Sequence, residues 1–311
     1  MIAIQQQANP KAWNDVRHGL FTASCIGKLM TTPRLTKEMK ERIDAGAVFF
    51  GDTAETYIAQ VAAERATGVR ERNPSTYSMK RGIVLEEAAI HLLTKDWTPI
   101  DGCAFMAYGD NSGATPDGLL FKGTATMDLK CPEAYTDVLR FGVEVPDNDF
   151  DALEAWDKTY AWQVMHQAKC AGVKEAWLVY FTDRLPWIKL SEEDRDIAQQ
   201  IIDFACDRLA EGSEFPFGYT FGSDGYFYVA RRFELTDERS DKIDRVLMAA
   251  EVECVNMQHT FKNLRNCLQT TMELMESAEV SSAIAKHGLT KAQGHLSDAI
   301  AVMNGTLGDM K

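Results

Sequence analysis

The amino-acid sequence predicts a mixed α/β fold, in which a central mixed sheet is flanked by helices and followed by a long helical C-terminal extension. Between about residues 13 and 209, short strand-like runs alternate with segments whose apolar residues recur at helical spacing. Turn-forming groups containing Gly, Asp, Asn and Ser separate the strand-like runs. From about residue 236 the periodicity is helical.

The first third of the chain predicts two helices, one over Thr53–Ala66 and one over about Arg81–Leu93. Apolar residues recur on one face of each, as packing against a core requires. Before them, Thr22 or Ser24 stands where a helix N-cap is expected, at the end of the segment that begins at Trp13.

The middle of the chain predicts a strand-rich core. Strands are expected at Ala104–Tyr108, Leu119–Lys122 and Thr126–Lys130, with turn residues between them. A helix over Tyr160–Ala171 and a strand over Glu175–Thr182 follow. This order of strands and helix is typical of a compact α/β unit.

Beyond residue 212 the pattern changes, and we expect three regions: a main domain over 1–212, a linker or small hairpin over 213–235 and a helical extension over 236–311. The extension carries a heptad-like apolar stripe with spacings of four and three. Its members are Ile243, Leu247, Ala250, Cys254, Met257, Phe261, Leu264 and Leu268. Such a stripe must pack against the main domain, the helix expected over Leu289–Met303, another subunit or another protein.

The formal net charge of −13 argues against a broad, nonspecific surface for nucleic acid. It leaves room for a local basic lining, and a metal site needs carboxylates. An acidic stretch over 141–157 contains Pro and no Lys or Arg, which predicts a solvated loop.

The seven cysteines contain no CxxC pair, so we expect reduced thiols rather than a disulfide framework or a zinc ribbon. No apolar run approaches the roughly 20 residues that span a bilayer. The first residues lack a basic region followed by an apolar stretch. A cytoplasmic protein without a membrane partner is therefore expected.

Three motifs carry the candidate chemistry. Gly82 and Glu86 lie four residues apart on a predicted helix, and Asp117 stands in a Thr-Pro-Asp-Gly turn between two strands. The third motif, Asp-Leu-Lys, places Asp128 and Lys130 on a strand. Because residues i and i+2 of a strand point to the same face, this acid and this lysine project together.

Asp117 meets this pair if a hairpin joins the two strands, and the carbonyl of Leu129 is then a further oxygen ligand. Hard oxygen ligands suit Mg²⁺, for which Mn²⁺ can substitute. A lysine beside them can orient or deprotonate a water, or stabilise charge on a phosphate. Each motif alone is a common turn or strand fragment, but their conjunction in this order, between predicted strands and after a predicted helix, is far more specific.

Two further motifs agree with these three: Trp162-Gln163 and the N-terminal set Trp13, Arg17 and Ser24. Together the five motifs resemble the phage-type exonuclease family that includes lambda exonuclease and the YqaJ-like viral recombinases. The resemblance covers about residues 11 to 212. It implies a PD-(D/E)XK nuclease, whose core is similar to that of restriction endonucleases.

The resemblance also implies a role for each matching residue. Metal ions would be bound by Asp117, Asp128 and the Leu129 carbonyl, and Glu86 would hold a metal-bound water. Lys130 would be the catalytic lysine, and Gln163 would orient either that lysine or the water. Here the acid before Leu129 is Asp, where members of the family often have Glu.

A pocket for a DNA 5′-phosphate would consist of Arg17, Ser24 and Thr115, where Thr115 replaces the Ser of the family. Arginine offers a fork of donors to a phosphate, and hydroxyls add neutral donors. His166 follows Gln163 by three residues, so it is either a DNA contact or, as we expect, a structural histidine.

The implied activity is that of a Mg²⁺-dependent, two-metal 5′→3′ exodeoxyribonuclease. It would act on double-stranded DNA ends and leave 3′ single-stranded overhangs for phage-type homologous recombination in a bacterial host. The resemblance further implies a homotrimeric ring and a single-strand-annealing partner. Two alternatives remain: an endonuclease of the same fold and a noncatalytic DNA-binding assembly protein.

Overall fold

The computed structural model describes residues 15–69, 82, 85–86, 89–90, 92–94, 97–132, 134–183 and 226–276. The chain divides into two compact units, Met1–Glu253 and Cys254–Lys311, and the architecture below is that of the first unit. None of the helices within these described ranges is both long and apolar enough to cross a membrane.

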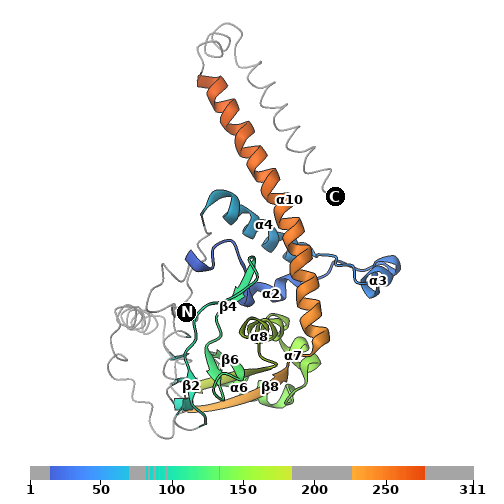
Figure 1. Cartoon of the computed structure of the whole chain (residues 1–311). Helices are drawn as coiled ribbons and strands as arrows, with labels where there is room; N and C mark the ends of the chain where they lie inside the picture. The colour runs from blue at the N-terminus through green and yellow to red at the C-terminus, as the bar shows by residue number, and fades with distance from the viewer. Residues whose placement is uncertain are drawn as a thin grey trace. The chain divides into compact units, whose positions relative to one another are not determined.

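A five-stranded mixed sheet forms the centre of the first unit (Figure 1). In spatial order its strands are β2 (Ile100–Asp101), β5 (Gly118–Leu120), β6 (Ala125–Lys130), β7 (Glu175–Asp183) and β8 (Tyr226–Glu234). β6 and β7 are parallel, and the other neighbouring pairs are antiparallel. This sheet, with helices packed on it, confirms the predicted fold class. β5 is shorter than expected because Phe121 and Lys122 adopt positive φ angles in the turn that follows.

The alternation of side chains along β6 determines which residues reach the site. Met127 and Leu129 enter an apolar cluster on one face of the sheet. Asp128 points to the opposite face, which α8 (Lys158–Ala171) covers. Eight consecutive residues of α8, from 161 to 168, are buried, so this helix lies deep in the first unit.

A second, three-stranded sheet joins the N-terminal segment to the chain that precedes the β5–β6 hairpin. Its order is β1 (Phe21–Thr22), β4 (Ser112–Ala114) and β3 (Met106–Tyr108), and β1 and β4 are parallel. Thr22 pairs with Gly113, so the carboxyl ends of both strands lie at one edge. β4 includes two residues expected in a turn. Gly113 permits this close packing, because a Cβ there would lie 2.3 Å from the ring of Phe105.

The other helices of the first unit are α2 (Ala23–Leu29), α3 (Lys37–Asp44), α4 (Asp52–Thr67), α6 (Tyr135–Glu144) and α7 (Phe150–Trp156). They include three that the sequence did not predict, α3, α6 and α7. The prediction of a solvated loop over 141–157 was wrong, since α7 lies within it. Two of its acidic residues cap helices: Asp149 accepts a hydrogen bond from the Ala152 N–H, and Asp157 accepts one from the Tyr160 N–H.

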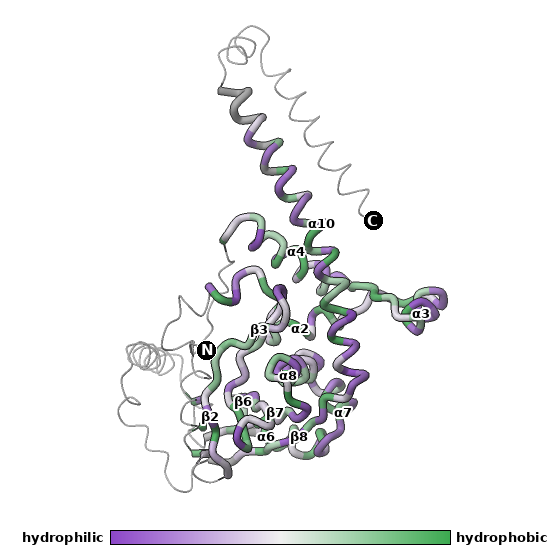
Figure 2. The backbone as a smooth tube through the Cα atoms, viewed as in Figure 1, coloured by the Kyte–Doolittle hydropathy of each residue, from purple (hydrophilic) through white to green (hydrophobic). Residues whose placement is uncertain are grey.

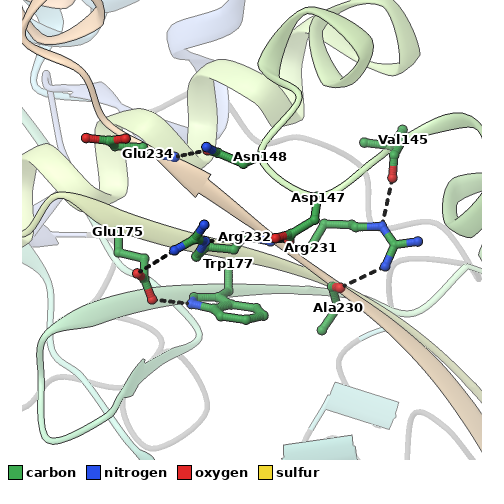
Figure 3. Close-up of polar contacts among 9 residues, drawn as sticks. All are labelled: Val145, Asp147, Asn148, Glu175, Trp177, Ala230, Arg231, Arg232 and Glu234. Carbon is green, nitrogen blue, oxygen red and sulfur yellow. Dashed lines mark hydrogen bonds and ion pairs between the residues drawn. The ribbon is translucent and has the colours of Figure 1, made fainter.

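β8 is the edge strand of the main sheet, and the loop between α6 and α7 covers its outer side (Figure 3). The Arg232 N–H donates to the Asp147 carboxylate at 2.7 Å, and the Arg232 carbonyl accepts from the Asn148 N–H at 2.7 Å. The Glu234 N–H donates to the Asn148 side chain at 3.0 Å. These bonds occupy groups that a bare edge would leave open to aggregation. Residues 226–234, expected in a linker or hairpin, are therefore a structural strand of the sheet.

α10 (Asp237–Glu276) is a continuous helix of 40 residues, and it carries the apolar stripe that the sequence predicted. Hydrophilic and hydrophobic residues alternate along it (Figure 2). In the first half of this helix, three residues of the apolar stripe are buried: Ile243, Leu247 and Ala250. Ion pairs from Asp244 to Lys169 and from Glu251 to Arg65 join the same half to the α/β body. This part of the apolar stripe therefore packs within the first unit.

Candidate active site

The β5–β6 hairpin brings Asp117 beside the strand that carries Asp128 and Lys130. The Asp117 N–H donates to the Met127 carbonyl at 3.0 Å. Its carboxylate Oδ2 accepts from the Leu129 N–H at 2.6 Å. The turn before β5 thus fixes both the backbone and the side chain of Asp117 against β6, as the hairpin hypothesis required.

Asp128 is almost completely buried, and three side chains hold its carboxylate. Lys130 Nζ lies 2.6 Å from Oδ2. Gln163 Nε2 and Gln167 Nε2 both donate to Oδ1, at 2.5 and 2.8 Å. The two glutamines are one turn apart on the face of α8 that covers β6. A buried charge needs this degree of pairing, and here the pairing also fixes the rotamer of the acid.

Lys130 remains an ammonium ion in this setting. Burial lowers the pKa of Lys130, but the carboxylates of Asp128 and Asp117 outweigh that effect and raise it above its ordinary value. The ammonium group also lies 4.6 Å from the centroid of the Tyr160 ring, at cation–π distance. Its side chain is 21% exposed, so it can reach a substrate. These surroundings favour an electrostatic role for the lysine over that of a free amine base.

Asp117 lies among like charges. Desolvation raises the pKa of Asp117 well above its ordinary value, and the charges of Glu86 and then Asp128 raise it further, against the opposing effect of Lys130. Glu86, which is helical and half-buried, is therefore close enough to act on the same carboxyl group. Asp117, Asp128 and Glu86 together carry more negative formal charge than Lys130 offsets, and the excess of about two charges matches one divalent cation.

A hard divalent ion fits this donor set in charge and in atom type. Among the residues that the structure describes, no three His, Cys, Asp or Glu side chains converge into a ready-made metal cluster. Mg²⁺ does not require such a cage, since it is commonly bound by one or two carboxylates and completed by water and phosphate oxygens. Asp117, Asp128 and the Leu129 carbonyl offer such oxygens.

Two of the residues expected to bind a terminal phosphate, Arg17 and Ser24, are in direct contact. Arg17 Nη2 donates to Ser24 Oγ at 3.2 Å, and Thr22 Oγ1 lies 3.3 Å from the same oxygen. Thr115 directly follows β4, and Ser24 lies in the first turn of α2, two residues after the Thr22 that pairs with Gly113 of β4. The hydroxyl of Thr115 is buried and has no hydrogen-bond partner within the described residues, which is unusual for a buried polar atom.

His166 is structural, as the sequence analysis favoured. It is completely buried, its ring meets that of Tyr108 edge to face at 6.2 Å, and its Nε2 lies 3.6 Å from Cys170 Sγ. Burial, followed by the charge of Lys169, lowers the pKa of His166 to about 3. The ring is therefore neutral at physiological pH, and its contacts are with Tyr108 and Cys170.

Two site residues, Gln167 and Tyr160, did not emerge from the sequence. Gln167 repeats the position of Gln163 one helical turn later, so the i, i+4 spacing was the signal that could have found it. Tyr160 precedes Gln163 by three residues on the same helix and supplies the ring beside Lys130. Neither role follows from the motifs themselves, because each depends on how α8 crosses β6.

Comparison with known proteins gives structural relatives alone: no family model matches the sequence, and no curated protein does. An alkaline exonuclease from Laribacter hongkongensis superposes with a TM-score of 0.54 at 21% identity, over 83% of this chain and 99% of that chain. Its complex with dAMP gives a TM-score of 0.55 with the same identity and coverage. A phage-related exonuclease from Haemophilus somnus gives 0.54 at 17% identity, over 81% and 99% of the two chains. The chain thus has the fold of alkaline and phage-related exonucleases, the type of nuclease that its motifs resemble.

Proposed function

We propose that this chain is a Mg²⁺-dependent 5′→3′ exodeoxyribonuclease that acts on the ends of double-stranded DNA. The observation that carries the proposal is the group formed by Asp117, Asp128, Lys130 and Gln163 in a fold shared with solved exonucleases. Glu86 adds a third carboxylate to this group. All the acids and the lysine that hydrolysis requires are present, which disfavours a noncatalytic DNA-binding role.

Asp117, Asp128 and the Leu129 carbonyl would hold Mg²⁺ or Mn²⁺, with Glu86 beside them. When bound, the ions would polarise the phosphodiester and generate a nucleophile from water at neutral pH. The protein groups have separate tasks. Lys130 places a positive charge where charge develops on the phosphate, and Gln163 keeps Asp128 in one orientation. No covalent intermediate with the protein is required.

The polarity of the reaction would come from the pocket of Arg17, Ser24 and Thr115. This pocket joins the carboxylates through the chain itself, since Thr115 precedes Asp117 by two residues. A bound 5′-phosphate would therefore place the first phosphodiester of that strand near Asp117. Repeated binding and cleavage would leave a 3′ single-stranded overhang, the substrate for phage-type recombination.

The net charge of −13 also needs an explanation if the protein moves along DNA. We propose a homotrimeric ring, in which a basic lining would face the DNA while the acidic exterior faces solvent. A single-strand-annealing protein would be the partner that receives the overhang.

Gel analysis of linear duplexes labelled at the 5′ or the 3′ end, with and without a 5′-phosphate, tests this function. We expect Mg²⁺-dependent release of labelled mononucleotide from the 5′ end first, and faster loss when that end is phosphorylated. Covalently closed circular duplex serves as the control and should survive. Cleavage of the circle would instead indicate an endonuclease, and an absence of cleavage under all divalent ions would refute the proposal.

A further inference from the structure

Glu251 of α10 forms a two-pronged ion pair with Arg65 near the end of α4. Its two carboxylate oxygens accept from Arg65 Nη1 at 2.7 Å and from Nη2 at 2.9 Å. Both side chains are mostly covered, with 17% of Arg65 and 30% of Glu251 exposed. A fork-to-fork pair of this kind fixes the plane of the guanidinium group as well as its position.

The third donor of the same guanidinium group holds the N-terminal loop. Arg65 Nε donates to the Gly19 carbonyl at 2.7 Å, and the neighbouring Glu64 carboxylate accepts from the Gly19 N–H at 3.2 Å. Gly19 has a φ of +67°, and a Cβ there would lie 2.7 Å from Arg65 Cγ. Glycine is thus required for the arginine to lie across the loop.

Gly19 belongs to the turn that presents Arg17. The Leu20 N–H donates to the Arg17 carbonyl at 3.3 Å and closes the turn around Gly19. Arg17 then reaches Ser24 with its side chain. A continuous set of contacts therefore leads from Glu251 through Arg65 and Gly19 to the guanidinium group expected to bind the terminal phosphate.

We infer that Glu251 is a positioning residue for recognition of the 5′-phosphate, an inference that rests on the proposed function. The pocket lies on a loop that has to hold an arginine at a defined distance from two hydroxyls. Positioning of this kind tolerates little slack, because a displacement of about 1 Å can cost 100-fold in rate. α10, more than 200 residues later in the chain, supplies the contact that limits this slack.

The test measures kcat/KM of the full-length protein on 5′-phosphorylated and 5′-hydroxyl duplexes. Glu251→Ala should reduce the ratio between the two substrates by about three- to tenfold, in keeping with a partly exposed, charge-assisted pair. Glu251→Gln keeps one acceptor for Arg65, so its ratio of kcat/KM between the two substrates should lie between those of the parent and Glu251→Ala. Glu253→Ala removes an exposed carboxylate two residues further along α10 and should discriminate as the parent does. Thermal unfolding of each variant monitors the fold.

The outcomes separate this inference from the proposed function. If Arg17→Ala loses the discrimination but Glu251→Ala keeps it, the positioning role is wrong and the pocket stands. Equal losses of kcat/KM on both substrates in Glu251→Ala would indicate a structural role alone and would also refute the inference. If Arg17→Ala discriminates as well as the parent, the pocket itself is misassigned and the inference falls with it. A graded loss confined to the phosphorylated duplex supports it.

Discussion

Replacing Asp117 with asparagine should abolish cleavage and, at the same time, stabilise the metal-free protein. The loss of cleavage follows from the removal of a charged oxygen ligand. The stabilisation follows from burial, which disfavours the ionised form of Asp117, and from Glu86 and Asp128, whose charges repel it. Asparagine keeps a carbonyl oxygen that can accept the hydrogen bond from the Leu129 N–H.

The direction of the effect depends on pH. A carboxyl group whose pKa is raised in the folded state contributes stability that is full below its unfolded pKa of about 4 and is lost as pH rises through the folded pKa. At pH 8, the buried carboxyl group of Asp117 therefore costs stability that Asp117→Asn regains. We expect a gain of the size typical of single stabilising substitutions, about 0.5–2 kcal/mol, which is roughly 2–4 °C in Tm per kcal/mol.

Thermal unfolding in EDTA at pH 5 and at pH 8 measures this gain. The difference in Tm between Asp117→Asn and the parent should be larger at pH 8. Asp241→Asn, at an exposed position of α10, controls for the loss of one charge from an acidic protein. Added Mg²⁺ should raise the Tm of the parent more than that of Asp117→Asn. A variant less stable than the parent at pH 8 would refute the argument that like charges strain this site.

Three further experiments address the site and the assembly. Lys130→Ala should lower turnover by several orders of magnitude in gel assays, while filter binding of DNA persists. Turnover equal to that of the parent would contradict a catalytic role for Lys130. Gln167→Leu should lower kcat about tenfold with unchanged DNA affinity, because Asp128 loses one of its charge-assisted hydrogen bonds. An unchanged kcat would show that Gln163 and Lys130 are sufficient to position Asp128. Light scattering should give about three times the 34.8 kDa chain mass, and a monomer at micromolar concentration would contradict the ring.

The sequence predicted the parts of the site that depend on spacing along one element. Asp128 and Lys130 share a strand face because side chains alternate there, and the turn at Asp117 predicted the hairpin that joins them. Contacts between different helices and strands could not be predicted from the sequence. Gln167 and Tyr160 reach the site because α8 crosses β6 at a particular angle, and one sequence does not encode that angle in any local pattern. β4 could not be predicted for a similar reason. Its sequence, Ser-Gly-Ala, has little strand propensity, and the strand forms by pairing with β1 and β3.

The same limit explains why the boundary expected at residue 212 falls inside the first unit. β8 pairs with β7 over nine residue pairs, from Glu175–Glu234 to Asp183–Tyr226, so a chain that ends at 212 lacks a strand of the central sheet. It also lacks Asp244 and Glu251, which hold α8 and the loop of Arg17. The composition after residue 212 resembles that of a linker, because an edge strand carries aromatic and polar residues and needs no continuous apolar run. A chain ending at 253 keeps all these contacts, and it should therefore retain cleavage of short duplexes where a chain ending at 212 loses it together with its fold.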